Sequence, residues 1–350
     1  MKVSKIVLTG GPGAGKTTVL RRLQQNLEEK GYKVIIVSET ARELAEAGIE
    51  LGGSDDYILK IQELILKRQL EKERTIEEFA KDAYMQDVVI LHDRGAIDNK
   101  AYLKSDDDFD DILMKTNENE INICDNYDMV INLKSTANLG KEFYMQDEIR
   151  REGAEESLLL DNKTTKAWVM APNIKTFYPT IDKEEKINNV INLVNDFLEG
   201  KMEITNKKEK IKGENKALKN IIEKEDVKII YCTDYYINSN IENVKYIVTK
   251  RRYNNAQSCV LKAIKEENGR KYLLKSEPIS DNEFLNLRVN NGVIDTKTMA
   301  QIKYVNKHGK ITTISKEKDG LYLEYDAKDY GPNDKTDVKS KIKMLKFDNK

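Results

Sequence analysis

A glycine-rich run near the N-terminus constrains the fold of this chain more than any other feature. Residues 10–18 read Gly-Gly-Pro-Gly-Ala-Gly-Lys-Thr-Thr and satisfy the spacing G-x-x-x-x-G-K-[ST]. The apolar run 6–8 comes before it and predicts a strand, and residues 18–30 have the apolar spacing of a helix. A strand, a glycine turn and a helix in this order predict a phosphate-binding loop, or P-loop, in an α/β domain.

The P-loop predicts a site for the phosphates of a purine nucleotide, ATP or GTP, with Mg2+. Its glycines let backbone N–H groups turn inward, and the next helix directs its positive end at the same charge. Lys16 is expected to reach the β- and γ-phosphates, and the Thr17 hydroxyl to bind Mg2+. The nucleotide-binding residues predicted in this way are Gly11, Gly13, Ala14, Gly15, Lys16, Thr17 and Thr18.

Two further strand ends carry chemistry. The buried-type strand 88–91 leads to Asp93, which we predict as a second Mg2+ ligand and catalytic residue, although an Asp at a strand end also forms turns. Glu39 and Arg42 follow the apolar run 34–37 at the same predicted sheet edge. Glu39 would suit a general base for an acceptor hydroxyl, and a capped helix start explains the segment equally well.

Composition excludes several classes of protein. With 39% hydrophobic and 34% charged residues and no run of about 20 apolar residues, the chain reads as a soluble protein without a membrane span. We expect it in the cytoplasm. The three cysteines lack metal-ligand spacing, and with only His92 and His308 a histidine-based metal site is not expected.

The chain divides into two predicted domains. Residues 1–199 alternate strands and helices, which predicts a parallel sheet flanked by helices. Residues 200–226 are expected to form a charged linker or an exposed connecting helix, residues 227–335 predict an antiparallel β domain of barrel type, and residues 336–350 form a basic tail. Residues 201–350 carry 32 Lys and Arg against 22 Asp and Glu, so this half suits an anionic partner or is a solvated lysine-rich surface.

Residues 3–197 resemble the AAA-type P-loop family that is similar to ribosylnicotinamide kinase. The motifs that carry the resemblance are residues 10–18, residues 39–42, Gln62, the pattern Asp93-Arg94-Gly95-x-x-Asp98, and the later run 150–161 with Trp168. The resemblance implies that the later run is a lid and that Arg150, or its neighbour Arg151, neutralises charge on the transferred phosphoryl group. Without the resemblance, residues 150–156 read as an ordinary charged helix face.

In the β domain, cations on alternate strand positions predict an anion-binding face. These residues are Lys250, Arg252, Lys262, Lys275 and Lys303. The segments around them resemble the CYTH-like triphosphate-tunnel domain, but the opening strand 228–234 lacks the alternating glutamates that hold metal there. A P-loop domain followed by such a domain resembles the TRPL translocation defect proteins, which implies binding of GTP and phosphoinositides.

The sequence favours a Mg-dependent ATP- or GTP-binding protein with slow hydrolysis of the nucleotide. Its β domain would bind a polyanionic phosphate such as a phosphoinositide or polyphosphate, with peripheral membrane contact as one consequence. The alternative is a nucleoside or nucleotide kinase that transfers the γ-phosphoryl group to a small acceptor. Nucleic-acid binding is not expected, because Tyr246 and Tyr253 form no stacking signature. The sequence contains no N-K-x-D segment of the kind that GTPases use to recognise guanine, so it does not distinguish ATP from GTP as the ligand.

Overall fold

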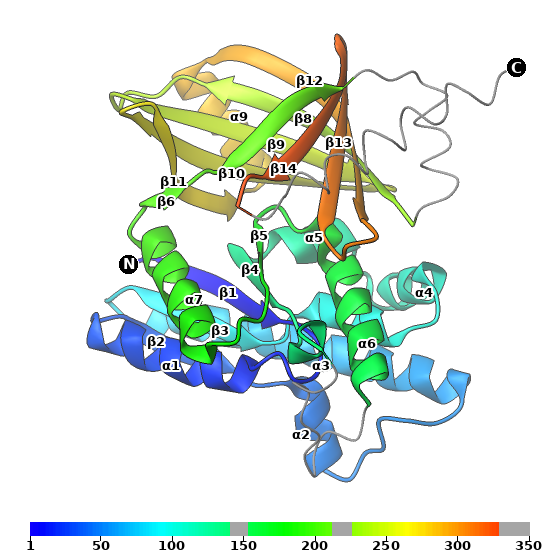
Figure 1. The fold of residues 1–350 in the computed structure, drawn as a ribbon. Helices are drawn as coiled ribbons and strands as arrows, with labels where there is room; N and C mark the ends of the chain where they lie inside the picture. The colour runs from blue at the N-terminus through cyan, green and yellow to red at the C-terminus, as the bar shows by residue number, and fades with distance from the viewer. Residues whose placement is uncertain (141–152, 212–225, 329–350) are drawn as a thin grey trace, which may run out of the picture. The chain divides into compact units, whose positions relative to one another are not determined.

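The computed structural model describes residues 1–140, 153–211 and 226–328 (Figure 1). The chain splits into two compact units, Met1–Glu199 and Gly200–Lys350, and each unit is described by itself.

The first unit is built on a parallel sheet of five strands with the order β2-β3-β1-β4-β5. The strands are β1 (Val3–Thr9), β2 (Lys33–Val37), β3 (Val88–Asp93), β4 (Met129–Leu133) and β5 (Ile174–Phe177). Strands β1, β3 and β4 are buried along almost their whole length, because helices cover both faces of the sheet. The predicted parallel α/β fold is therefore confirmed.

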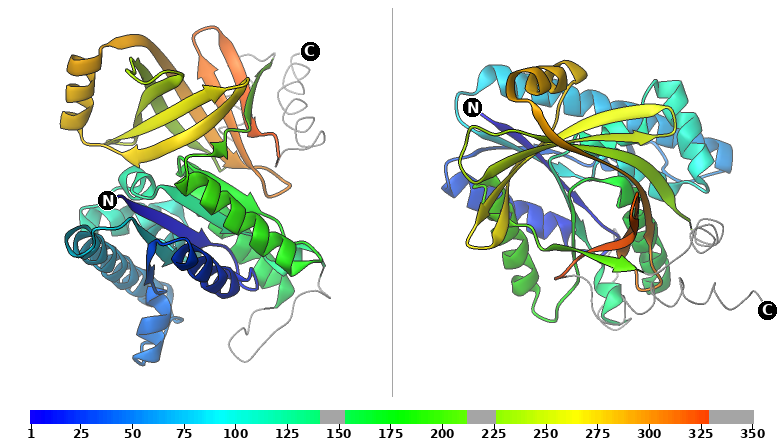
Figure 2. Two further views of the ribbon diagram at one scale, coloured as in Figure 1. Left: turned by 90° about the vertical axis from the view of Figure 1, so that its left-hand side faces the viewer. Right: turned by 90° about the horizontal axis from the view of Figure 1, so that it is seen from above.

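Helices occupy the connections between these strands (Figure 2). They are α1 (Lys16–Glu29), α2 (Thr40–Glu46), α3 (Asp55–Ala83), α4 (Asp106–Thr116), α5 (Glu120–Asp125), α6 (Ala154–Ala167) and α7 (Lys183–Leu198), with 3-10 turns η1 (Ala96–Tyr102), η2 (Thr136–Asn138) and η4 (Trp168–Met170). Helix α3 begins where Ser54 accepts a hydrogen bond from the Tyr57 amide, as an N-cap does. Its C-terminal part packs Ala80 against Val88 and Ile90 of β3.

The second unit is a nine-stranded antiparallel sheet in the order β6-β11-β10-β9-β8-β12-β13-β14-β7. The strands are β6 (Met202–Glu203), β7 (Asn206–Ile211), β8 (Lys228–Ile237), β9 (Val244–Tyr253), β10 (Ala256–Glu267), β11 (Arg270–Pro278), β12 (Val293–Val305), β13 (Ile311–Glu317) and β14 (Gly320–Asp326). Helix α9 (Asp281–Asn291) joins β11 to β12 and buries Phe284 against β8, β9 and β10. The antiparallel β class is confirmed, and Figure 2 shows how strongly the strands curve.

Part of the predicted linker 200–226 is wrong, because residues 202–203 and 206–211 form β6 and β7 at the two edges of this sheet. The segment shows no apolar face in the sequence since most side chains of β7 are exposed, and charged residues are common on edge strands. Ile211 alone joins the apolar cluster of the sheet. The rest of the predicted linker from residue 212 to 225 and the basic tail 336–350 lie outside the described residues.

Candidate functional site

The turn between β1 and α1 depends on glycines with positive φ. Gly10, Gly13 and Gly15 have φ values of 138°, 71° and 83°, which other residues rarely adopt. At Gly10 a Cβ atom would lie 2.0 Å from the backbone oxygen of Leu133 on β4, so no side chain fits there. The glycine spacing in the sequence therefore corresponds to a compact turn held against the neighbouring strand.

Lys16, the first residue of α1, turns back over this loop. Its Nζ donates to the carbonyl oxygens of Gly10 at 2.9 Å and Gly11 at 3.2 Å. Burial, assisted by the charge of Arg94, lowers the pKa of Lys16 to about 8. Two neutral carbonyls compensate a desolvated ammonium only in part, so an anionic ligand at this point would stabilise the charged form.

The corner after β3 is tight and strained. Asp93 ends the strand, and Arg94 follows with φ 69°, in the left-handed region that is costly for a residue with a side chain. At Gly95 a Cβ atom would lie 2.8 Å from the indole ring of Trp168, so only glycine fits under that ring. This geometry directs Arg94 back toward the P-loop, where its Nη1 lies 3.4 Å from the Gly10 carbonyl oxygen.

Arg94 lies between two carboxylates. Its Nε donates to Glu39 Oε1 at 2.7 Å, and its Nη1 lies 3.3 Å from Oδ1 of the buried Asp98. Burial acts to raise the pKa of the Glu39 carboxyl, but the charges of Arg94 and Lys16 outweigh it and hold that pKa below its usual value. Glu39 is therefore ionised at neutral pH.

Asp93 is the carboxylate whose charge is poorly compensated. Burial first, and then the charge of Glu39, raise the pKa of Asp93 in spite of Lys16 and Arg94. A divalent cation would offset both effects. Thr17 lines the same pocket. The Asp93 carboxylate and the Thr17 hydroxyl are thus the kind of oxygen ligands that bind Mg2+ together with phosphate oxygens and water. Within the described parts of the chain, no three His, Cys, Asp or Glu side chains form a metal site of their own.

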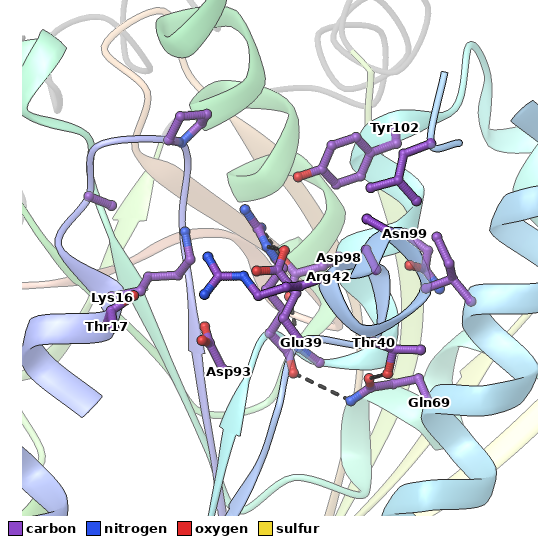
Figure 3. A pocket seen from close by; sticks show the side chains of 18 of the residues that line it. Lys16, Thr17, Glu39, Thr40, Arg42, Gln69, Asp93, Asp98, Asn99 and Tyr102 are labelled. Atoms are coloured by element: carbon purple, nitrogen blue, oxygen red, sulfur yellow. Dashed lines mark hydrogen bonds and ion pairs between the residues drawn. The ribbon is translucent and has the colours of Figure 1, made fainter. Parts of the chain in front are cut away.

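These side chains line one pocket beside the P-loop, with a volume of about 520 Å³ (Figure 3). Such a volume is in the range of small-molecule sites. The pocket brings together seven of the predicted site residues: Gly13, Ala14, Gly15, Lys16, Thr17, Glu39 and Asp93. Gly11 and Thr18 do not line it. Arg150, the predicted lid residue, lies outside the described residues.

Sequence reasoning missed Gln69 and Glu73, two buried polar residues of α3, and named only Gln62 on that helix, through the family resemblance. Gln69 of α3 donates to Glu73 Oε1 at 2.6 Å and contacts the hydroxyl of Thr40, so it ties α3 to the residue next to Glu39. Gln62, Gln69 and Glu73 are all buried and recur along the apolar stripe of α3. Polar side chains at the buried positions of a helix are rare, and this pattern was the available signal.

The second unit divides its five predicted anion-binding residues between the two faces of the sheet. Strand pairing places Lys262 and Lys303 on the face that carries Arg251, which is buried. Lys250 and Lys275 lie on the opposite face, where Lys250 pairs with Asp281 of α9 at 3.0 Å and Lys275 with Glu277 at 2.5 Å.

Arg252 shares that opposite face with Lys250 and is exposed. The expectation of one common face is therefore wrong for Lys250, Arg252 and Lys275. The phase of β9 is set by Val248, which is buried against Phe284 of α9. Lys250 and Arg252 share the face of Val248, and Arg251 lies on the other face.

The face with Arg251, called here the polar face, concentrates charge that is poorly solvated. Burial and then the charge of Arg251 lower the pKa of Lys303 to about 8, and the same two causes lower the pKa of Lys262. Glu324 of β14 acts on Lys262 of β10, although five strand spacings, about 24 Å in a flat sheet, separate those strands. The sheet must therefore curl to bring them near one another.

Comparison with known proteins identifies the first unit. The sequence model described as AAA domain matches residues 5–186, slightly more than half of the chain, and the chain belongs to this family. The first unit is accordingly a nucleotide-binding P-loop domain. The solved structure of the PH1819 protein from Pyrococcus horikoshii OT3 is similar over 40% of this chain and 88% of that chain, with 14% identity and a TM-score of 0.29.

The helices of the described ranges, 1–140, 153–211 and 226–328, include none with both the length and the apolar character needed to cross a membrane.

Proposed function

We propose that the first unit transfers the γ-phosphoryl group of ATP or GTP to a hydroxyl group of a small acceptor. The observation that carries this proposal is the position of Glu39. Its ionised carboxylate, held by Arg94, lines the same pocket as Lys16, Thr17 and Asp93. Slow hydrolysis of a nucleotide needs no such pocket beyond the P-loop, whereas transfer to an acceptor does.

On the nucleotide side, the P-loop amides and the N-terminal end of α1 hold the phosphates, and Lys16 neutralises the γ-phosphate. Thr17 and Asp93 would hold Mg2+, which supplies charge neutralisation at the β- and γ-phosphate oxygens when it is bound. Lys16 would exchange two carbonyl contacts for a phosphate contact, which stabilises its charged form.

On the acceptor side, Glu39 takes the proton of the acceptor hydroxyl while the hydroxyl oxygen of the acceptor bonds to the γ-phosphorus. The bond between that phosphorus and the β–γ bridging oxygen breaks, and the nucleoside diphosphate leaves. Arg94 fixes the orientation of Glu39. Arg42, also in the pocket wall, adds positive charge near the site of transfer.

An acceptor screen tests the proposal with Glu39→Gln, Lys16→Ala and a matched control. Glu43→Gln is that control, because Glu43 lies on α2, which begins directly after Glu39, is 46% exposed on its side chain and does not line the pocket. We expect phosphorylated product with wild type and Glu43→Gln, and a loss of about 10²- to 10⁴-fold in Glu39→Gln with nucleotide binding retained. Lys16→Ala should weaken nucleotide binding itself. Turnover at full rate without any acceptor would contradict the proposal.

A second candidate is a nucleotide-dependent switch whose second unit binds a polyanionic phosphate, such as a phosphoinositide headgroup or polyphosphate. The observation that favours it is the polar face, where burial and then the charge of Arg251 lower the pKa of both Lys262 and Lys303. An anion there would relieve this repulsion. Lys262→Ala with Lys303→Ala should abolish polyphosphate binding, and Lys250→Ala with Arg252→Ala, on the opposite face, should leave it unchanged. Equal loss in both pairs would contradict a site on the polar face.

A further inference from the structure

The carbonyl groups of three consecutive P-loop residues are bonded from outside the loop. The donors are side chains and one amide of the segment after β4, of α6 and of α7. The contacts are Ser135 Oγ at 2.6 Å and Ser157 Oγ at 3.0 Å to the Pro12 oxygen, Thr136 N at 3.5 Å to the Gly13 oxygen, and Lys186 Nζ at 3.1 Å to the Ala14 oxygen.

This outer bonding determines where the amides of the loop point. In a trans peptide the C=O and N–H bonds point in opposite directions, and the described chain contains no cis peptide. Carbonyls drawn outward at Pro12, Gly13 and Ala14 therefore direct the next N–H groups toward the inner side of the turn, where phosphate binds. Of these, the Ala14 amide makes only a long contact, 3.4 Å, to the Gly11 oxygen.

A buried carboxylate of α6 organises the outer contacts. Asp161 Oδ1 accepts from the amides of Gly11 at 3.2 Å and Ser135 at 3.1 Å. Its Oδ2 lies 3.0 Å from Lys134 Nζ and accepts from Asn138 Nδ2 at 3.1 Å. Asp161 and Lys134 are 0% and 1% exposed on their side chains. A buried carboxylate with this many donors is expensive to disturb, so it holds its partners in one arrangement.

Helix α6 also touches the loop directly. A Cβ atom at Gly11 would lie 2.8 Å from Asp161 Cβ, so the second glycine of the P-loop is needed for this close approach. Ser157 precedes Asp161 by one helical turn and thus faces the same side. We propose that Ser157 and Asp161 are positioning residues that orient the P-loop amides toward the nucleotide triphosphate, with Lys134 as the counter-ion of Asp161.

The test compares Ser157→Ala with Thr164→Val in the full-length protein. Thr164 is a buried hydroxyl on the same helix, and its hydroxyl hydrogen bond goes to Leu160 within α6. Binding of MgATP, MgGTP and inorganic triphosphate would be measured by calorimetry, with thermal unfolding as the measure of stability. We expect Ser157→Ala to weaken all ligands that wild type binds by about three- to tenfold, the effect of one hydrogen bond, and Thr164→Val by less than about twofold.

A second pair of variants addresses the ion pair. Asp161→Asn leaves the charge of Lys134 buried without its counter-ion, whereas the combined change Asp161→Asn and Lys134→Met removes both charges. We expect the combined variant to fold and still to bind triphosphate about tenfold or more weakly, with shifted 31P resonances of bound ATP. If Ser157→Ala and the combined variant bind triphosphate as wild type does, the proposal is overturned, whatever their melting temperatures.

Discussion

The protonation of Lys16 gives a quantitative prediction for nucleotide binding. In the free protein, burial and Arg94 lower the pKa of Lys16 to about 8. A bound triphosphate favours the charged ammonium and raises that pKa, so binding above the free pKa takes up a proton. Affinity should therefore be level below this pKa and fall as pH rises through it. The expected loss between about pH 7 and pH 9 is about tenfold, since each unit above the pKa costs tenfold.

Isothermal titration of MgATP and MgGTP in pairs of buffers with different ionisation enthalpies measures both the affinity and the proton uptake. We expect uptake of close to one proton at the upper end of that range and none at the lower end. Lys16→Ala should bind weakly and without pH dependence. Lys186 also has a pKa of about 8 and donates to the P-loop, so the same slope in Lys16→Ala would assign the proton to Lys186 and refute the account of Lys16.

Three substitutions test the geometry around the loop and the corner after β3. Gly10→Ala should abolish nucleotide binding, measured by calorimetry, and lower the yield of soluble folded protein. The reason is that the new Cβ would clash with the backbone oxygen of Leu133 on β4. Gly95→Ala should lower the free energy of unfolding by about 1–3 kcal/mol through its clash with Trp168, measured by denaturant titration. Arg94→Lys should keep the charge but lose the fixed contact with Glu39, so turnover with an acceptor should fall at least about tenfold while nucleotide affinity changes little.

Much of the first unit was predictable because its elements are local. The buried strands are short apolar runs, and the P-loop glycines are required by backbone geometry at named positions. Strand β5 was missed since it is a short edge strand whose four residues are all partly exposed. The bond from Glu39 to Arg94 joins residues 55 positions apart, and no local pattern reports such a distance.

The second unit shows where strand patterns stop being informative. The strands were predicted from β-branched residues and turns, but Lys250, Arg251 and Arg252 are adjacent cations, and charge alone cannot say which of them faces inward. The answer depends on Val248 and on the helix packed over it. The P-loop contacts of Asp161 were equally hidden, because an aspartate in a helix usually reads as a surface residue.

The most direct test of the proposed phosphoryl transfer follows the γ-phosphate itself. The protein would be incubated with MgATP or MgGTP and a mixture of small hydroxyl acceptors in 18O-labelled water, and the products read by 31P NMR and mass spectrometry. The account predicts a new phosphomonoester without 18O, formed by wild type and lost in Glu39→Gln. Inorganic phosphate that carries 18O as the sole product, at the same rate in both proteins, would contradict it.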